Sequence, residues 1–568
     1  MFQVENFLQE KYPSISAKPM RYKALVGVLR YLLHETEFEE FGQNYPYLEG
    51  IDFVEKVLEY FNFSYSVSNT DREKIPSQGK AVIVANHPIG SLDGLALIKL
   101  VYDIRSDVKI VANDLLMSLK PLRKLLLPVN NMGGRTPKEN LNEINEHLNS
   151  EGVVIIFPAG EVSRMALAGI RDGHWKTGFL RIAAAAKAPI LPIYLDARNS
   201  ILFYLTSIIY KPMATVLLVK EMFKQATKTV GVKIGNPIPF KNFDNLPFDN
   251  RHIAGLFRKH VYSVGLKKRP IFESETPIAH PEKSAEVYEH LSKHDRIGET
   301  PDGKQIFLCQ NLSDSPILRE IGRLREFSFR TVGEGTGFKR DTDQYDRYYF
   351  HLVLWDNKAL EIVGAYRFCD AAKVISEKGL DGLYTNSLFE FGSNMESYLS
   401  QSLELGRSFV QPKYWGKRSL DYLWYGIGAF LKRNPQYRYL FGPVSISDQL
   451  PQRAKDLLVY FYSLYFSENS LNAHSYNPYV FDDELSKQLK TNFTGNDYKK
   501  DFVELKSLLG NLGVSVPTLY KQYTELCEEG GVKFLDFGRD PEFAGCVDGL
   551  VLVDTHLLKE KKKKRYLA

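Results

Sequence analysis

The sequence has little cysteine and no strong excess of charge. Its four cysteines, Cys309, Cys369, Cys527 and Cys546, are scattered through 568 residues. That scatter matches neither the paired spacing of a zinc site nor the density of a disulfide scaffold. The net charge of +5 is mild for a chain of this length. We therefore expect no metal site, no disulfide framework and no nucleic-acid partner.

Long hydrophobic runs are also absent. No stretch reaches the roughly 18 uninterrupted apolar residues that a membrane-spanning helix requires. The opening MFQVENFLQEKYPS carries acidic side chains and no apolar core, so we expect no signal peptide. The most apolar stretch, residues 201–223, is split by Lys211 and Pro212, and it fits either a core or a segment lying in the membrane interface. These features predict a peripheral protein on the cytoplasmic face of the inner membrane.

Basic side chains are concentrated at the carboxyl-terminal end. The ending KEKKKKRYLA holds six of them between Lys559 and Arg565. Two interpretations stay open for this basic tail. It is either a solvated, frayed end or a segment attracted to anionic lipid headgroups.

The length and the alternation of apolar patterns predict two α/β domains. A chain of this length is too long for one ordinary core. Strand-like runs alternate with helical patterns from about residue 80, which predicts a sheet with crossover helices, and a second alternation follows residue 303. Residues 281–302 are charged and contain proline, so we expect a linker there, between domains at 1–280 and 303–568.

A histidine and an aspartate stand out in the stretch VIVANHPIGSLDG. Residues 82–85 predict a short buried strand, and His87 follows it, where α/β folds usually place their chemistry. Asp93 lies beyond a turn that contains Gly90. A histidine oriented by a carboxylate can take the proton of an acceptor hydroxyl as a general base. We therefore predict that His87 and Asp93 form a catalytic pair.

Three further stretches belong with this pair. PVNNMGGRTP places an arginine on a glycine-rich turn, FPAGEVSR follows a predicted strand, and APILPIYL is a strand with two prolines. Arginines after such turns suit an anionic or carboxylate-bearing acceptor. The four stretches in this order resemble the four blocks of the glycerolipid acyltransferases of the lysophosphatidate type, over about residues 80–239. The resemblance implies that His87 is the base, that Asp93 is its partner, and that the substrate is bound by Asn86, Gly90, Arg135, Gly160, Glu161, Ser163 and Arg164.

Two departures from that pattern refine the resemblance. Five residues separate the histidine from the aspartate where the family usually has four, so the loop must bulge. The third block normally reads Phe-Pro-Glu-Gly, whereas here Ala159 holds the acid's place and Glu161 follows the glycine. Both features resemble a haemolysin-like bacterial branch that acylates lipids other than glycerol phosphates.

The second half carries polar residues within predicted strands. Asp343 and Asp346 precede one strand, and Arg367 lies on the next. Glu404 and Arg407 are three residues apart, and side chains on a flat strand alternate, so they cannot share one face without a bulge or a strand end. A salt-bridged turn and a structural ion pair remain the alternatives to a binding site.

A basic turn, KYWGKRS, leads into the helix that follows. It contains Lys413, Gly416, Lys417 and Arg418. Backbone N–H groups at such a turn can hold phosphate or pantetheine oxygens. A plain connection between elements is the alternative.

These features resemble the GNAT N-acyltransferase superfamily, and most sharply the acyl-homoserine-lactone synthases and the bacterial ornithine N-acyltransferases, over about residues 303–554. The resemblance implies acceptor-binding or structural roles for Asp343, Asp346, Arg367 and Arg407. Glu404 is the preferred base. The acyl donor is expected at Lys413, Gly416, Lys417 and Arg418. Arg418 stands where glycine or alanine is usual, which favours a donor carried on the acidic acyl carrier protein.

Together the two halves resemble the fused bacterial ornithine lipid synthases. The second domain is expected to join a 3-hydroxyacyl group to an amino acid such as ornithine or glycine. The first is expected to esterify the resulting lyso-aminolipid at its 3-hydroxyl. Acyl carrier protein, or coenzyme A, carries the acyl co-substrate, and no bound cofactor is expected. A monofunctional lysophospholipid acyltransferase with an inert second domain, and a non-catalytic membrane lipid-binding protein, are the alternatives.

Overall fold

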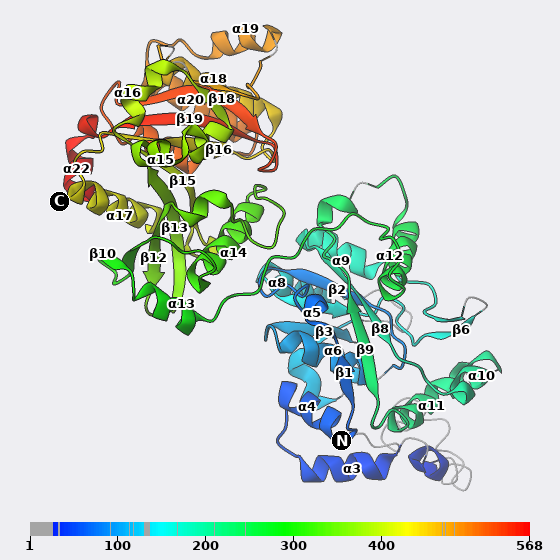
Figure 1. Ribbon diagram of the computed structural model, residues 1–568. Helices are drawn as coiled ribbons and strands as arrows, with labels where there is room; N and C mark the ends of the chain where they lie inside the picture. Colours follow the sequence, from blue (N-terminus) through cyan, green and yellow to red (C-terminus); the bar gives the residue numbers. More distant parts are fainter. Residues whose placement is uncertain are drawn as a thin grey trace. The chain divides into compact units, whose positions relative to one another are not determined.

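The computed structural model divides the chain into two compact units, Met1–Pro277 and Ile278–Ala568. It describes residues 26–31, 34–90, 92–112, 114–117, 119–129, 137–166, 169–209, 211–244, 246–468, 470–471, 473–481 and 483–567. Each unit contains its own large sheet with helices against it (Figure 1). The predicted α/β fold in two domains is therefore confirmed.

The first unit is built on a mostly parallel sheet in the order β1-β9-β8-β2-β5-β3-β4, in which only β8 and β9 run antiparallel. Its strands are β1 (Ser64–Ser66), β2 (Ala81–Ala85), β3 (Val108–Ala112), β4 (Leu126–Pro128), β5 (Val153–Ile156), β8 (Ile190–Asp196) and β9 (Thr229–Ile234). The central strands β2 and β5 are buried along their whole length, as their apolar runs predict. The carboxyl ends of β2, β5 and β8 meet at one edge, so the segments that follow them lie together.

Helices cover both faces of this sheet. The described helices of this unit are α3 (Glu35–Asn44), α4 (Gly50–Tyr60), α5 (Asn69–Arg72), α6 (Leu92–Tyr102), α7 (Asp114–Met117), α8 (Lys138–Asn149), α9 (Gly178–Ala186), α10 (Ile201–Ile209), α11 (Lys211–Phe223) and α12 (Asn250–Gly265). Successive side chains of β2 alternate between the faces: Ile83 packs with α4 and α6, whereas Val82 packs with α8, α9 and α12. A small ribbon, β6 (Arg164–Ala166) and β7 (Gly169–Arg171), stands apart from the sheet.

The second unit contains a mixed sheet in the order β10-β11-β12-β13-β15-β16-β19-β18. These strands are β10 (Asp295–Glu299), β11 (Gln305–Cys309), β12 (Phe350–Asp356), β13 (Glu361–Asp370), β15 (Ser402–Val410), β16 (Tyr439–Ile446), β18 (Val532–Asp540) and β19 (Cys546–Asp554), and β14 (Phe389–Phe391) pairs separately with β17 (Ala473–Ser475). Only β15 and β16 run parallel in the large sheet.

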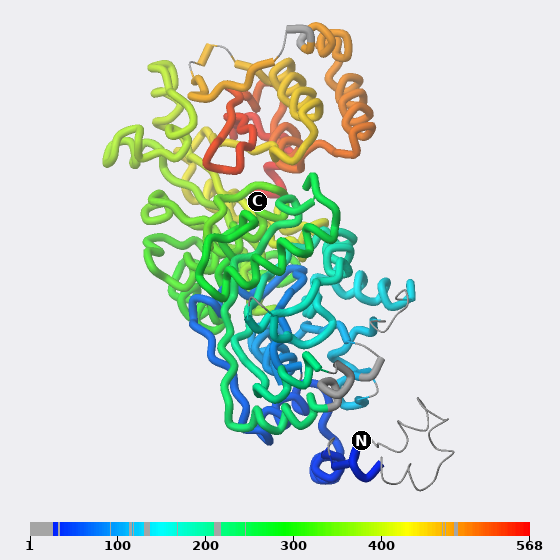
Figure 2. The backbone as a smooth tube through the Cα atoms, turned by 90° about the vertical axis from the view of Figure 1, so that its right-hand side faces the viewer, coloured from blue at the N-terminus to red at the C-terminus, as the bar shows by residue number. Residues whose placement is uncertain are grey.

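Helices again pack on both faces of the second sheet. The described helices of this unit are α13 (Ser284–Leu291), α14 (Pro316–Thr331), α15 (Ala371–Lys378), α16 (Glu396–Leu399), α17 (Ser419–Arg433), α18 (Gln452–Phe466), α19 (Asp483–Asn492), α20 (Tyr498–Asn511), α21 (Thr518–Thr524) and α22 (Glu560–Tyr566). One core joins α13 and α14 to the sheet, and another joins α17, α18, α20 and α21 to the opposite side. Figure 2 shows the yellow helix α18 beside the red strands, where it packs on β18, and the orange helix α20 on its outer side.

The structure corrects one prediction about a segment and decides against one of the two interpretations left open for the basic tail. Residues 281–302 are not a linker, because they contain α13, which packs on α14, and β10, which pairs with β11. The charged side chains of these residues lie on the exposed surface of a folded segment, and in the sequence alone they resemble those of a linker. The frayed end, one of the two interpretations of the basic tail, does not match the structure. The tail forms α22 against α17, where Tyr566 is buried and its hydroxyl donates to Asp421 at 2.7 Å.

Within the described residues, no helix is both long and apolar enough to cross a membrane.

Candidate active sites

The first unit joins His87 to Asp93 at the carboxyl-terminal edge of its sheet. His87 follows β2, and Asp93 lies in the first turn of α6. The His87 Nδ1 and Asp93 Oδ2 atoms are 3.1 Å apart. The Asp93 side chain is fully buried, whereas that of His87 retains 19% of its exposure. With Nδ1 held by the carboxylate, Nε2 is the nitrogen that is left for a substrate.

The turn between the two residues closes on the carboxylate. The backbone N–H groups of Ile89 and Gly90 donate to Asp93 Oδ2 at 3.1 and 3.2 Å, and that of Gly94 donates to Oδ1 at 3.0 Å. The five-residue spacing is therefore absorbed by a loop that supplies hydrogen-bond donors to the acid. These donors, together with the N-terminal end of α6, favour the charged carboxylate.

This pair has the electrostatics of a general base and its orienting acid. Burial lowers the pKa of His87, but the charge and hydrogen bond of Asp93 outweigh it, so the pKa of His87 is raised. Burial acts against the charged form of Asp93, but His87 and the backbone donors outweigh it and lower the pKa of Asp93. The ring of His87 also stacks on Phe157, with centroids 4.2 Å apart, which fixes its plane.

Asp172 is a component of this site that the sequence reasoning missed. Its carboxylate accepts from the His87 backbone N–H at 3.2 Å, from the Ser163 hydroxyl at 2.5 Å and from the Trp175 Nε1–H at 2.9 Å. Burial raises the pKa of Asp172, although these donors oppose the rise. The only signal in the sequence is an acid beside a glycine in IRDGHW. Asp172 therefore connects the FPAGEVSR stretch, through Ser163, to the turn that carries His87.

Most of the other residues predicted for this site lie beside the turn that carries His87. Asn86 exchanges hydrogen bonds with the backbone of Leu195 at 2.9 and 2.8 Å, so it links β2 to β8. The segment Gly160–Arg164 lies against the histidine turn, because the Ser163 N–H donates to the His87 carbonyl at 2.8 Å. Glu161 and Arg164 form an ion pair at 3.3 Å beside it. Arg135 lies outside the described residues.

Gly90 allows the close approach that this packing needs. Its φ is +83°, and a Cβ atom there would lie 2.1 Å from Val162 Cγ1. Val162 is itself buried under α10 and α11. No L-residue fits this position without moving its neighbour.

Gly90→Ala is expected to destabilise the first unit by roughly 2–4 kcal/mol, because left-handed strain and overpacking each cost about 1–3 kcal/mol. Hydrogen exchange of peptides from β2 and α6 would measure this loss. The double variant Gly90→Ala/Val162→Ala removes the overlap and should recover part of the protection. Equal protection in the wild-type and Gly90→Ala chains would contradict this account of the turn.

In the second unit, a cavity of about 740 Å³ lies where the parallel strands β15 and β16 separate. Their ladder, all of whose residues are described, runs from Ser402–Tyr439 to Glu404–Phe441 and then ends. Both strands continue beyond that point, and they contribute Arg407–Val410 and Pro443–Ser445 to the lining. Much of the rest is apolar: Phe329, Val332, Leu420, Leu450, Val514, Leu519 and Phe543. The cavity therefore suits a ligand with a fatty chain.

A β-bulge turns Arg407 into this cavity, as the spacing from Glu404 predicted. The register between β13 and β15 shifts between Ala365 and Arg367, and Arg407 has a φ of +50°. Its guanidinium lies between the rings of Tyr384 and Phe543, 4.6 and 4.9 Å from their centroids. Bulges commonly re-aim a side chain beside a site.

The predicted acidic and basic residues around Arg407 form a buried ion network. Asp343 and Asp346 both pair with Arg367, and the Asp343–Asp346 turn is closed by a capping box. Arg407 Nε lies 3.3 Å from Asp341, and its Nη2 lies 3.7 Å from Asp343. Arg367 and Asp346 are 1% exposed, so they are closed to an acceptor, and Arg407 is held by Asp341 and Asp343.

Glu404 occupies a different position from the one that a base needs. It is 1% exposed. Its carboxylate accepts from the Tyr349 hydroxyl and from the backbone N–H and hydroxyl of Thr385. It is not among the residues that line the cavity. The structure therefore shows Glu404 as the centre of a buried hydrogen-bond cluster.

Glu404→Ala is expected to cost the second unit at least about 3 kcal/mol, since several buried donors lose their acceptor at about 1–3 kcal/mol each. Glu404→Gln keeps one acceptor oxygen and should cost less. Urea unfolding of the three proteins measures this order. A Glu404→Gln chain with wild-type stability but no chemistry in the second unit would instead support Glu404 as the base.

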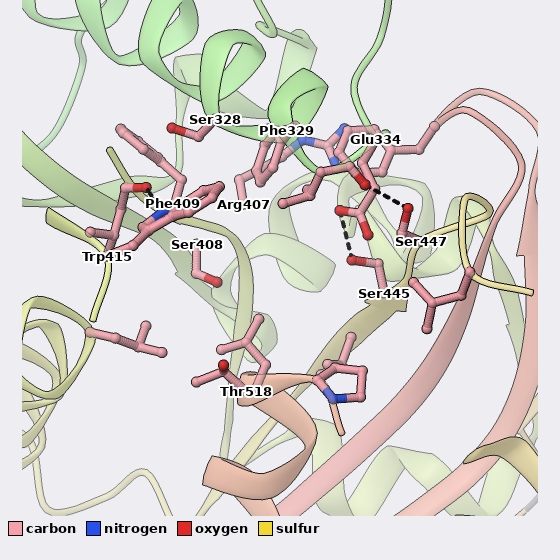
Figure 3. Close-up of a pocket in the computed structure, with 18 of the residues that line it drawn as sticks. Ser328, Phe329, Glu334, Arg407, Ser408, Phe409, Trp415, Ser445, Ser447 and Thr518 are labelled. Carbon is pink, nitrogen blue, oxygen red and sulfur yellow. Dashed lines mark hydrogen bonds between the residues drawn. The ribbon is translucent and has the colours of Figure 1, made fainter. Parts of the chain in front are cut away.

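Two carboxylates that the sequence reasoning missed do line the cavity. Glu334 follows α14, and the Ser445 hydroxyl donates to its Oε2 at 3.1 Å (Figure 3). Burial raises the pKa of Glu334 to about 7, against the opposing Ser445 hydrogen bond and Arg407 charge. Burial and the charges of Asp540 and Glu334 raise the pKa of Asp548 to about 8. Carboxylates that change charge near neutral pH in a cavity are candidate proton acceptors.

The basic turn lies on the same cavity. Trp415, Gly416 and Lys417 line it, and Gly416 takes a φ of +72° just before α17 begins. Lys413 pairs with Glu361, and Arg418 pairs with Asp421. The turn is thus placed beside the apolar lining, with part of its charge already neutralised.

Comparisons with known proteins agree with this division of the chain. Residues 6–267 match the family described as acyltransferase, and residues 324–425 match the acetyltransferase (GNAT) domain. The glycine N(alpha)-acyltransferase of Bacteroides thetaiotaomicron is 30% identical over 46% of this chain and 81% of that protein. The lyso-glycine lipid O-acyltransferase of the same species is 33% identical over 43% of this chain and 90% of that protein.

Weaker similarities extend the list. The L-ornithine N(alpha)-acyltransferase of Brucella abortus is 32% identical over 26% of this chain and 62% of that protein. The solved 1-acyl-sn-glycerophosphate acyltransferase of Thermotoga maritima aligns at 20% identity over 39% of this chain and 78% of that chain, with a TM-score of 0.27.

The fold and these matches define an acyltransferase, with an acyltransferase domain followed by a GNAT domain. The chain belongs to the families of the glycine N(alpha)-acyltransferase and of the lyso-glycine lipid O-acyltransferase that it matches. The resemblances found in the sequence are confirmed at this level.

Proposed function

We propose that the chain makes an aminolipid by two successive acylations, one in each unit. The second unit forms an amide between a 3-hydroxyacyl group and the α-amine of a small amino acid, glycine or ornithine. The first unit then esterifies the 3-hydroxyl of that product with a second acyl group. The observation that carries the proposal is that each unit holds its own partly buried proton acceptor, His87 on Asp93 in one and Glu334 in the other.

Amide formation requires the α-ammonium to lose a proton before it attacks. In this step a carbon–nitrogen bond forms at the thioester carbonyl and the carbon–sulfur bond breaks. One nitrogen proton passes to Glu334 and on to solvent, and the other goes to the departing thiolate. A pKa of about 7 leaves Glu334 ionised in a large share of molecules at neutral pH, which suits this role.

The surroundings of Glu334 fit the other parts of the two substrates. Arg407 supplies a cation for the α-carboxylate. The apolar lining fits the acyl chain, and the turn at Gly416 and Lys417 supplies backbone N–H groups for pantetheine or phosphate oxygens. Acyl carrier protein is the proposed carrier, with coenzyme A as the alternative.

Ester formation in the first unit is a single transfer. The hydroxyl oxygen attacks the thioester carbonyl as His87 Nε2 takes its proton, and the imidazolium returns that proton to the departing thiolate. Asp93 stabilises the imidazolium, as its effect on the pKa of His87 indicates. No covalent acyl-enzyme is required.

A two-stage assay with the purified chain tests the proposal. The chain is first given 3-hydroxyacyl-acyl carrier protein with labelled glycine or ornithine, and then a second acyl-acyl carrier protein. We expect a mono-acylated product that converts into a diacylated one. Acylation of lysophospholipid alone would favour a monofunctional enzyme. Binding of lipid without any turnover would favour a lipid-binding protein.

A further inference from the structure

The helix α10 exposes a continuous apolar face. Its large side chains Ile201, Leu202, Leu205, Ile208 and Ile209 are between 50% and 84% exposed. At 3.6 residues per turn these five positions fall within an arc of about 120° on one side of the helix. The opposite side carries Phe203 and Tyr204, which are buried. The helix α10 therefore has one side packed against the protein and one apolar side that is exposed.

The inner face fastens α10 to the His87 site. Phe203 and Tyr204 pack on Val162, the residue that lies against Gly90. Arg164 from β6 donates to the Ser207 hydroxyl on the same helix. The exposed face of α10 is therefore fixed to the loop that carries the catalytic histidine. Figure 1 shows α10 and α11 at the margin of the first unit, beyond the sheet.

The segment of chain that contains α10 carries charge of one sign. Between Asp196 and Glu221 the sequence contains no acidic residue and three cations, Arg198, Lys211 and Lys220. Met165, on the neighbouring ribbon β6, adds a further apolar side chain that is 40% exposed. An apolar face within a basic segment is complementary to the interface of an anionic bilayer, where acyl chains meet negative headgroups.

We propose that α10 inserts its exposed face into the interface of an anionic phospholipid bilayer and so holds the His87 site at the membrane. This proposal rests on the proposed function, because that function requires a lipid acceptor to reach His87. An acceptor held in the bilayer would then meet the histidine without leaving the lipid phase.

Vesicle flotation of the full chain tests this insertion. Leu205→Asp/Ile208→Asp changes only side chains on the exposed face, so the fold should be kept. The matched control, Val480→Asp/Val503→Asp, alters exposed residues of the second unit. With vesicles of phosphatidylglycerol and phosphatidylethanolamine, we expect the α10 variant to bind at least tenfold less than the wild type, and the control to bind as the wild type does.

A fluorescent label reports whether the helix enters the lipid. The four native cysteines are all buried, so Ile208→Cys gives one accessible thiol for an environment-sensitive dye. We expect a blue shift on adding the anionic vesicles and none for dye at Val503→Cys. An unchanged spectrum at position 208, or undiminished flotation of the Leu205→Asp/Ile208→Asp chain, would overturn the proposal. So would a wild-type dimer that these aspartates convert to monomers without changing vesicle binding, since a second copy would then cover α10.

These measurements need no turnover, which separates them from the proposed function. A chain that binds vesicles through α10 but transfers no acyl group would overturn the two acylations and leave the insertion standing. If the chain acylates an aminolipid, but both double variants float with vesicles as well as the wild type does, the insertion of α10 is overturned and the two acylations stand.

Discussion

The variant His87→Ala is expected to slow ester formation by about 10²–10⁴-fold, the usual contribution of a general base, while amide formation continues. The proposed amide step does not use this imidazole, because its proton acceptor Glu334 lines a cavity of the second unit together with Arg407. Mono-acylated aminolipid should therefore accumulate. The rate is measured with purified chain, synthetic mono-acylated aminolipid and acyl-acyl carrier protein.

A matched control for His87 lies in the same unit. His174 is an exposed histidine, and His174→Ala should esterify at the wild-type rate. Asp93→Asn keeps the shape of the pair but removes the charge that raises the pKa of His87, so it should also be strongly impaired. Undiminished ester formation in His87→Ala would show that another group accepts the hydroxyl proton.

The variant Glu334→Gln is expected to slow amide formation by about 10²–10⁴-fold. Since the first unit depends on that amide, both products should disappear. Supplying synthetic mono-acylated aminolipid should restore the ester product, because the His87 site is intact. Glu542→Gln, an exposed acid near the end of β18, serves as the control and should keep both steps.

The pH dependence separates a base from a merely structural carboxylate. A base acts in its deprotonated form, so the rate of amide formation should rise with pH through about 7, the raised pKa of Glu334, and then level off. In Glu334→Gln the residual rate should lose that rise. A variant that keeps the rise would point to Asp548, whose pKa is raised to about 8.

The sequence was sufficient for those features whose parts lie close together in the chain. His87, Gly90 and Asp93 belong to one turn after one strand, so their contact followed from local rules of strand and turn formation. The bulge at Arg407 followed from its spacing to Glu404, because side chains alternate along a strand. The two-domain α/β fold followed from apolar periodicity.

The rest depended on tertiary contacts that one sequence does not display. Glu334 follows a helix and Asp548 lies in a strand far along the chain, and only the separation of β15 from β16 brings them to one cavity. Each left a weak local signal, an acid between two glycines and an acid near the start of a mostly apolar strand. Glu404 stood in a recognisable motif, but its burial under Tyr349 and Thr385 could not be read from that motif.

The exposed apolar face of α10 is a further feature that the sequence alone could not predict. The sequence left both a core position and a membrane-interface position open for residues 201–223, because composition alone does not say which side of a helix is covered. The structure shows Phe203 buried and Ile209 84% exposed. Where an apolar side chain points is a property of packing.

Lipid mass spectrometry of a bacterial host that lacks aminolipids, expressing the full chain, tests the two acylations most directly. The account predicts a new lipid containing one amino acid, one amide-linked chain and one ester-linked chain. Mild alkali should remove only the ester-linked chain. In the same host, His87→Ala should yield only the alkali-resistant mono-acylated lipid. A change confined to phospholipids, or a His87→Ala chain that still makes the diacylated lipid, would contradict the account.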